Sequence, residues 1–161
     1  MRVAGIDRYD MVNTPNTHSA AFSIWFQGCT IQCPDCHNKQ LWDKNGGQDM
    51  TVSSMLYDIY MAHTMHGVNC LALLGGEPLD QDINELCKLC SGAKHEGMEI
   101  WLYTGYEFDQ VPDSIKNRVD VIKTGRHDES RAADKWLGFL SSSNQKLHRK
   151  INNTWTEVMH L

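Results

Sequence analysis

The 161-residue sequence predicts an α/β fold, in the form of a partial, open (β/α) barrel with a mostly parallel sheet. Apolar runs of strand length alternate with segments of helical periodicity, and the connections between them are short. Glycine-bearing turns directly follow the predicted strands, as they do at the ligand-binding edge of parallel α/β folds. A complete eight-unit barrel needs roughly 200 to 250 residues or more. We therefore expect residues 1–161 to form one domain that holds only part of a barrel.

The first predicted strand spans residues 18–28, where aromatic and aliphatic side chains alternate before Gly28. A segment rich in cysteine follows it immediately. The next element is an amphipathic helix, for which Thr51 is the expected N-cap and Gly67 the stop.

Three later segments are predicted as strands that run into turns: residues 69–80, 98–106 and 118–125. The second predicted helix begins at the cap Asp82 and ends before Gly92. After Gly125 the pattern is open to two interpretations for residues 129–140, a helix or a wrapped loop. Residues 144–151 are typical of a last strand.

Composition fits an ordinary soluble globular protein, with 41% hydrophobic and 22% charged residues. The apolar run at residues 70–74 is far too short to cross a bilayer, so we expect no membrane partner. The N-terminus lacks the pattern of a secretion signal, which predicts a cytoplasmic protein. Thiols stay reduced in the cytoplasm, so six cysteines indicate metal binding or catalysis before disulfides.

Charge is distributed unevenly along the chain. Nine of the 15 Lys and Arg residues, but only five of the 20 Asp and Glu residues, lie after residue 115. The simpler interpretation is that two solvent-exposed faces of the protein carry charge of opposite sign. The alternative is that the basic part of the chain forms a docking face for an anionic partner. The basic residues are scattered and not interleaved with aromatics, which argues against nucleic-acid binding.

Three cysteines, Cys29, Cys33 and Cys36, follow the first predicted strand with the spacing C-x3-C-x2-C. Structural zinc sites use four protein ligands, and His37 is awkwardly placed as a fourth because it adjoins Cys36. A [4Fe–4S] cluster normally takes four thiolates, so three would leave one iron with an open coordination position. We therefore predict that the three cysteines hold a cluster whose fourth ligand is a small molecule, with a zinc knuckle as the alternative.

The other cysteines are predicted to pack in the core. Ile83, Leu86, Cys87 and Cys90 recur at helical spacing on one apolar face. Cys70 lies inside an apolar strand. Because a buried free cysteine behaves as a small hydrophobe, core packing is favoured over ligation for these three.

The cysteine motif after the first strand, together with GGEP at 75–78 after the second, resembles the radical S-adenosylmethionine (SAM) superfamily. Within it, CPDCHNKQLWD resembles the glycyl-radical-enzyme activases. The segments DMVNTPNT, LYTGY, VDVIKTGR and SSSNQK resemble, in that order, the activating proteins of anaerobic ribonucleoside-triphosphate reductase. The resemblance runs from about residue 8 to residue 150. This chain departs from the family at three places. The family often has glycine at the position of Asp35, and an acidic residue followed by glycine at the position of Lys123-Thr124-Gly125. The family's GSSNQ segment reads SSSNQ here, with Ser141 in place of its glycine.

The resemblance implies an enzyme that reductively cleaves SAM at a [4Fe–4S] cluster held by the three cysteines. Its product would be a glycyl radical in the C-terminal loop of the anaerobic reductase. An electron donor such as flavodoxin would reduce the cluster. One alternative is a radical SAM enzyme acting on a small molecule, similar to 7-carboxy-7-deazaguanine synthase. Another is a zinc-stabilised interaction module without catalysis.

The resemblance also implies a set of SAM-binding residues. The backbone of Asp35, Cys36 and His37 would lie against the adenine, whereas the His37 side chain could equally be a surface histidine. Gly75 and Gly76 would let the backbone approach the SAM amino group, with Glu77 orienting the turn; a simple strand-to-helix turn is the alternative. Thr104 and Gly105 would line the adenine or ribose region. Asn144 and Gln145 would at least cap the barrel edge.

Overall fold

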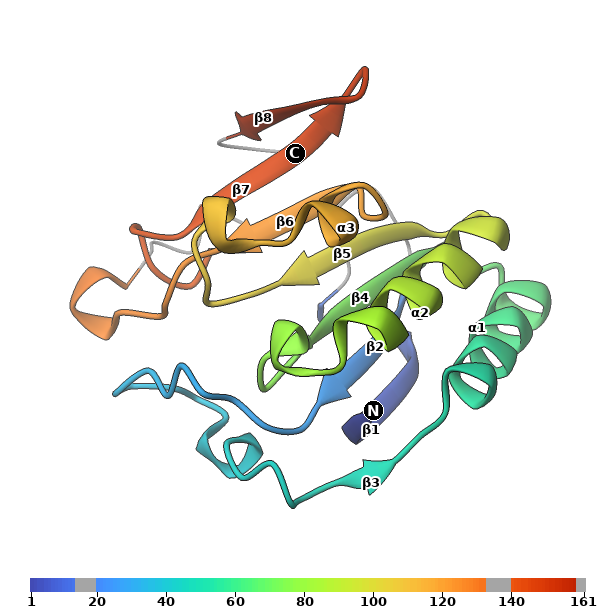
Figure 1. Ribbon diagram of the computed structural model, residues 1–161, viewed down its shortest axis with the longest axis horizontal. Coiled ribbons are helices and arrows are strands. Elements are labelled where there is room, and N and C mark those ends of the chain that lie inside the picture. Colours follow the sequence, from blue (N-terminus) through green and yellow to red (C-terminus); the bar gives the residue numbers. More distant parts are fainter. Residues whose placement is uncertain (14–19, 133–139, 159–161) are drawn as a thin grey trace.

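The computed structural model describes residues 1–13, 20–132 and 140–158, which form one eight-stranded sheet with the helices packed on one face (Figure 1). The strands run in the order β3-β1-β2-β4-β5-β6-β7-β8, and the ends of this order do not meet, so the sheet is open. The strands are β1 (Arg2–Asp10), β2 (Ala21–Phe26), β3 (Gln48–Asp49), β4 (Cys70–Gly75), β5 (Glu99–Tyr103), β6 (Val121–Thr124), β7 (Lys146–Ile151) and β8 (Thr154–Val158). The α-helices are α1 (Val52–His66), α2 (Ile83–His95) and α3 (Asp113–Lys116). Short 3-10 turns lie at Lys39–Leu41, Pro78–Asp80, Phe108–Gln110 and Glu129–Arg131.

The centre of the sheet is parallel and its edges are antiparallel. β2, β4, β5 and β6 pair in parallel, and α1, α2 and α3 lie in the connections between them. β1, β7 and β8 join antiparallel, so the sheet is mixed and the expectation of a mostly parallel sheet was wrong. The reason is local for β7 and β8, since they are joined at Asn152 and Asn153, both with positive φ. Such a tight turn yields antiparallel neighbours, whereas parallel pairing needs a long crossover.

The first predicted helix is confirmed at both ends. The Thr51 hydroxyl accepts a hydrogen bond from the Ser54 N–H at 3.1 Å, which satisfies one of the free donors of the first turn. Gly67 ends α1 in the left-handed conformation, with φ of 67°.

The second predicted helix begins at its cap as expected but ends later. The Asp82 carboxylate accepts from the N–H groups of Asn84 and Glu85, and α2 then continues through Gly92. A Cβ at Gly92 would lie 2.5 Å from a methyl carbon of Leu56 in α1. This glycine therefore serves the close packing of the two helices instead of ending α2.

The two ends of the sheet were not fully predicted. β1 was missed because charged residues interrupt its apolar alternation, and β3 because it is only two residues long. Residues 144–151 contain β7 as expected, but β8 follows it, so β7 is not the last strand. The segment 129–140 starts with a 3-10 turn, and its residues 133–139 lie outside the described part of the chain.

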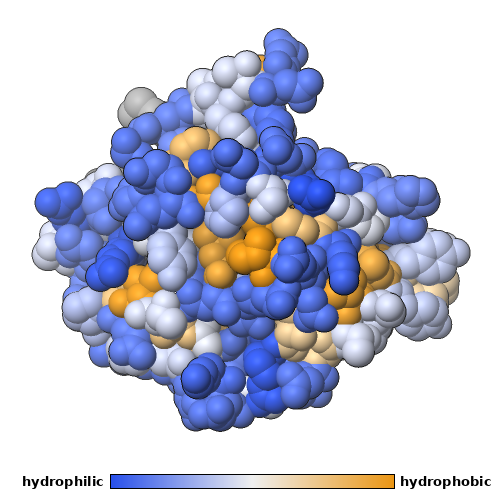
Figure 2. Space-filling view, in the orientation of Figure 1, coloured by the Kyte–Doolittle hydropathy of each residue, from blue (hydrophilic) through white to orange (hydrophobic). Residues whose placement is uncertain are grey.

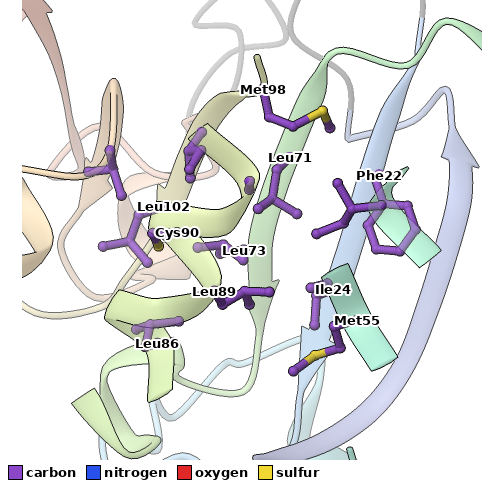
Figure 3. Packing of buried hydrophobic residues seen from close by; sticks show 14 of the residues in the cluster. Phe22, Ile24, Met55, Leu71, Leu73, Leu86, Leu89, Cys90, Met98 and Leu102 are labelled. Atoms are coloured by element: carbon purple, nitrogen blue, oxygen red, sulfur yellow. The ribbon is translucent and has the colours of Figure 1, made fainter. Parts of the chain in front are cut away.

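The two faces of the sheet carry different side chains. The face under the helices is packed with large apolar residues, such as Phe22, Leu73 and Leu102, against Met55 and Leu89 from the helices (Figure 3). The opposite face has smaller or aromatic residues at the alternate positions of the same strands: Ala21, Cys70, Ala72, Leu74, Trp101, Val121 and Leu147. The outer surface of the helical layer is largely polar with apolar patches between (Figure 2). In the described part of the chain, no helix is both long and apolar enough to cross a membrane.

The cysteines of the second helix and of β4 pack as expected. Cys70 and Cys90 are completely buried, and Cys87 is partly buried against the same core. Burial raises the pKa of the Cys90 thiol to about 12 and also raises the pKa of Cys70. These thiols are protonated at neutral pH and inaccessible, so they lack the thiolate character that ligation requires.

Candidate iron–sulfur and cofactor site

A pocket of about 390 Å³ opens where the four parallel strands end. Strand pairing brings these ends level, since Phe26 pairs with Gly75, and Tyr103 with Lys123. The turns after β2, β4, β5 and β6 therefore meet, although they are up to a hundred residues apart in the sequence. The predicted residues that line the pocket are Cys29, Cys33, Cys36, His37, Gly75, Gly76, Glu77, Thr104 and Gly105. Asp35 is the exception, because its side chain is exposed and does not line the pocket.

The cysteine loop is held by backbone hydrogen bonds to the segment that follows it. Gly28, with φ of 96°, donates its N–H to the Leu41 carbonyl at 2.8 Å, and Cys29 donates to Trp42 at 3.3 Å. Further along, the Asn38 N–H donates to the sulfur of Cys36 at 3.3 Å. Burial raises the pKa of Cys29, and all three thiols are partly exposed to the pocket. Three partly exposed cysteines in the lining of one pocket fit a [4Fe–4S] cluster bound by three thiolates.

The two glycines after β4 let that turn lie directly against the cysteine loop. Gly75 has φ of 111°, and a Cβ there would lie 2.5 Å from the backbone nitrogen of Phe26. A Cβ at Gly76 would overlap the carbonyl oxygen of Gly28. That same oxygen accepts the Glu77 N–H at 2.8 Å, while Gly76 donates its own N–H to Phe26. The observed role of these glycines is thus close backbone packing onto the loop that carries Cys29.

The Glu77 carboxylate joins the turn after β4 to the turn after β5. It is only 1% exposed, and its two oxygens accept from the Leu79 N–H, the Thr104 hydroxyl and the Gly105 N–H at 2.8 to 3.0 Å. The Thr104 oxygen accepts from the Tyr106 N–H, so its own hydrogen is directed to Glu77. Burial raises the pKa of Glu77 to about 7, and the three donors act in the opposite direction. This carboxylate therefore positions the pocket wall.

Asp80 makes a second link between the same segments, and sequence reasoning missed it. Its carboxylate accepts the Thr30 N–H of the cysteine loop at 2.6 Å and the Tyr106 hydroxyl at 2.8 Å. The oxygens of Thr30 and Tyr106 are themselves 3.2 Å apart. A single aspartate in a turn usually caps the turn in solvent, so the sequence carried no signal for this bridge.

The lining of the pocket includes a partly buried cation, Lys123. Lys123 and Tyr103 project from neighbouring strands, and the Lys123 ammonium lies 5.8 Å from the centre of the Tyr103 ring. Burial alone lowers the pKa of Lys123 to about 8, and no charged group contributes to that shift. The buried Tyr103 hydroxyl also lacks a hydrogen-bond partner among the described residues. A cation and a hydroxyl donor left in this state indicate a polar, anionic ligand.

The wall after β6 is built by Gln145, which sequence reasoning had placed only at the barrel edge. Its amide nitrogen donates to the Gly125 carbonyl at 3.0 Å, and its oxygen accepts from the N–H groups of Ser141 and Ser142. Gln145 is 7% exposed and lines the pocket. Asn144 instead donates to the Arg126 carbonyl, outside the pocket lining.

Comparison with known proteins agrees with the site. The family described as a 4Fe-4S single cluster domain matches residues 18–148. The anaerobic ribonucleoside-triphosphate reductase-activating protein of Enterobacteria phage T4 is 30% identical over 151 residues, which cover 91% of this chain and 92% of the relative. The protein of the same name from Escherichia coli strain K12 is 31% identical over 148 residues, covering 86% and 92%.

A relative of another kind matches less of both chains. The 7-carboxy-7-deazaguanine synthase of Prochlorococcus marinus is 32% identical over 105 residues, which cover 62% of this chain and 46% of that protein. The resemblance read from the sequence motifs is confirmed by the fuller matches. This chain belongs to the family of anaerobic ribonucleoside-triphosphate reductase-activating proteins, with a 4Fe-4S single cluster domain.

Proposed function

We propose that this protein activates an anaerobic ribonucleotide reductase by generating a glycyl radical in it, using a [4Fe–4S] cluster and SAM. One observation carries the proposal: the three thiols of the C-x3-C-x2-C motif share one pocket with the glycine turns after β4 and β5. When bound, a reduced cluster of this kind supplies the electron that splits SAM into methionine and a 5′-deoxyadenosyl radical.

In this proposal the residues of the chain bind and orient. Cys29, Cys33 and Cys36 would hold three irons, which leaves one iron for the amino and carboxylate groups of SAM. The Lys123 ammonium, which lines the same pocket, would offer a positive charge to that carboxylate.

The glycine turns would supply the remaining contacts. Without side chains, Gly75 and Gly76 would let the backbone come close to the SAM amino group. The backbone of residues 35–37, together with Thr104 and Gly105, would line the adenosine. The hydrogen bonds of Glu77 would keep these turns in register with the cysteine loop.

The open sheet suits a protein substrate. Because the sheet does not close, a glycine-bearing loop of the reductase could reach the cofactor from the open side of the pocket. The relatives named as activating proteins of this reductase support that partner. A flavodoxin is the expected electron donor, and we expect the reaction to take place in the cytoplasm, where thiols remain reduced.

Electron spin resonance tests the proposal. Protein reconstituted anaerobically with iron and sulfide is reduced and incubated with SAM, with and without the reductase. We expect about four irons per chain and a glycyl radical signal only when the reductase is present, and no signal with Cys36→Ala. SAM cleavage without a radical on the reductase would favour a small-molecule substrate, and a colourless protein that binds zinc would favour an interaction module.

A further inference from the structure

A second group of ligating side chains lies at the rim of the pocket, and the proposed function leaves these side chains unused. His37 follows the last cysteine of the motif, and His127 and Glu129 follow β6 on the other side of the pocket. Their donor atoms lie within 4.8 Å of one another, the only such group of His, Cys, Asp and Glu in the described ranges. One oxygen of Glu129 lies 3.0 Å from His127 Nε2 and 3.8 Å from His37 Nε2.

A chain of hydrogen bonds fixes which nitrogen of His127 faces Glu129. Gln145 is oriented by Gly125, whose carbonyl accepts from its amide nitrogen, so the Gln145 oxygen faces Ser141. The Ser141 hydroxyl donates to that oxygen at 2.9 Å and has only its lone pairs left for His127 Nδ1, 3.1 Å away. Nδ1 is therefore the donor to Ser141, and Nε2 is the nitrogen that faces Glu129.

This arrangement brings two possible metal ligands, His127 Nε2 and a Glu129 oxygen, close together. A hydrogen on Nε2 would make this 3.0 Å contact a hydrogen bond, and a metal ion would be bound by the nitrogen and the oxygen together. A second imidazole, that of His37, approaches the same oxygen, and the two rings have centroids 4.8 Å apart. Each proton joins only two of these three atoms, whereas one metal ion can bind all three.

We propose that His37, His127 and Glu129 form a mononuclear site for a divalent first-row transition metal, with Zn²⁺ as its ion. Two imidazoles and one carboxylate suit this borderline ion and leave a coordination position open for water or another ligand. With metal–ligand bonds of about 2.0 to 2.1 Å, the donors of a tetrahedral ion lie about 3.3 Å apart. The observed 3.0 and 3.8 Å bracket that separation. His37, with 71% of its side chain exposed, can make the small adjustment.

The proposed metal site differs from the cluster site in its ligand atoms and in the segments that a bound metal would connect. Its ligands are nitrogen and oxygen atoms, and the Gln145–Ser141 hydrogen bonds act as the outer support that orients a metal-bound histidine. A bound ion would join the cysteine loop to the segment after β6 across the rim of the pocket. The proposal does not depend on SAM cleavage, and its test reads metal content alone.

Equilibrium dialysis of the full-length protein tests the site. Protein carrying its reconstituted cluster is dialysed anaerobically against buffered Zn²⁺, and zinc and iron per chain are measured together. We expect the wild type to bind one zinc while keeping its iron. His127→Ala and the more conservative Glu129→Gln should each weaken that zinc more than tenfold without loss of iron. Ser141→Ala should weaken it roughly tenfold by releasing the ring.

Matched variants distinguish this site from adventitious surface binding and from binding by thiolates. His95 and Glu96 form an exposed histidine–carboxylate contact of 3.6 Å at the end of α2, and they belong to no three-ligand group in the described ranges, so His95→Ala should leave zinc binding unchanged. Equal zinc affinity in the wild type, His127→Ala and Glu129→Gln would overturn the proposal. Zinc uptake that releases iron in parallel, or that disappears only with Cys87→Ala/Cys90→Ala, would assign the ion to thiolates and would also overturn it.

Discussion

Two ionisable side chains, the buried Glu77 and the partly buried Lys123, set the electrostatics of the pocket. Burial shifts both toward their neutral forms, raising the pKa of Glu77 to about 7 and lowering that of Lys123 to about 8. Their surroundings differ, because Glu77 accepts three hydrogen bonds from the protein whereas no charged group offsets the effect of burial on Lys123. Glu77 thus links parts of the pocket wall, whereas the charge of Lys123 is available to bind an anionic ligand.

Replacing Lys123 by Met should stabilise the protein and weaken the binding of SAM. At neutral pH the buried ammonium costs stability, and removing it should raise the free energy of unfolding by on the order of 1 to 3 kcal/mol. The folded-state pKa, about 8, lies below the unfolded value of 10.5. The unfolded chain therefore binds more protons between these pH values, and wild-type stability should rise with pH across that window. Urea denaturation at pH 7 and above pH 10 measures this rise, which the variant should lack.

The control for this prediction is Lys146→Met on β7. Lys146 is half exposed and pairs with Glu157, so its loss should change neither stability nor SAM affinity appreciably. A destabilised Lys123→Met protein, or one whose reduced cluster titrates with SAM as in the wild type, would contradict the proposed role of Lys123.

Replacing Glu77 by Gln should loosen the pocket although the shape is nearly kept. The amide nitrogen of glutamine is a donor, and it would face either the Gly105 N–H or the Thr104 hydroxyl, both of which already donate to Glu77. Leaving such a buried donor without an acceptor costs about 1 to 3 kcal/mol. Thermal denaturation should show the loss. Glu107→Gln, at the exposed turn after β5, is the matched control and should leave the midpoint almost unchanged.

At the scale of elements, the site depends on how closely the turns after the strands approach one another. The turn after β4 lies directly on the loop after β2, because Gly76 has no side chain to hold the Gly28 carbonyl away. Asp80 and Glu77 then tie both segments to the turn after β5. The glycines of this turn therefore shape the cysteine loop before any cofactor binds.

Gly76→Ala should consequently impair cluster assembly itself. The new methyl group would overlap the Gly28 carbonyl, which accepts the Glu77 N–H, and backbone on both sides would have to shift. We expect a loss of about 1 to 3 kcal/mol in unfolding free energy and fewer irons per chain after reconstitution. Gly5→Ala on β1 is the control, since a Cβ there meets no atom within 4 Å. Full iron content in Gly76→Ala would show that the loop tolerates the shift.

At the scale of the whole molecule, the sheet separates a packing face from a binding face. The helices cover one face with a continuous apolar core, and the pocket lies at the strand ends, lined from the other face by Trp25, Leu74 and Tyr103. The six cysteines divide in the same way: three line the pocket, and the other three pack in the interior.

This division predicts opposite results for two cysteine substitutions. Cys36→Ala should abolish the intact cluster while changing the thermal midpoint of the cluster-free protein little, since Cys36 is partly exposed. Cys87→Ala/Cys90→Ala should cost on the order of 1 to 3 kcal/mol in stability, because Cys90 is fully buried, and should retain four irons per folded chain. Iron loss in the double variant at an unchanged midpoint would place a second metal site at α2.

The sequence by itself determined the central strands, the two long helices and the motif residues of the site. Side-chain periodicity, the caps Thr51 and Asp82 and the glycine turns are local signals, and local backbone preferences are enough to interpret them. The rule that parallel strands present their carboxyl ends at one edge then brought the cysteines, the GGEP turn and Thr104 together correctly.

Only the tertiary structure decided the features that depend on partners distant in the sequence. The end of α2 was misplaced because Gly92 is needed for contact with α1, which the sequence of α2 does not reveal. The antiparallel edges, the Asp80 bridge and the meeting of His37 with His127 and Glu129 also follow from chain packing. Each of these contacts joins residues whose local sequence would form the same secondary structure without the contact. Packing free energy between distant segments, and not local preference, therefore selects these features.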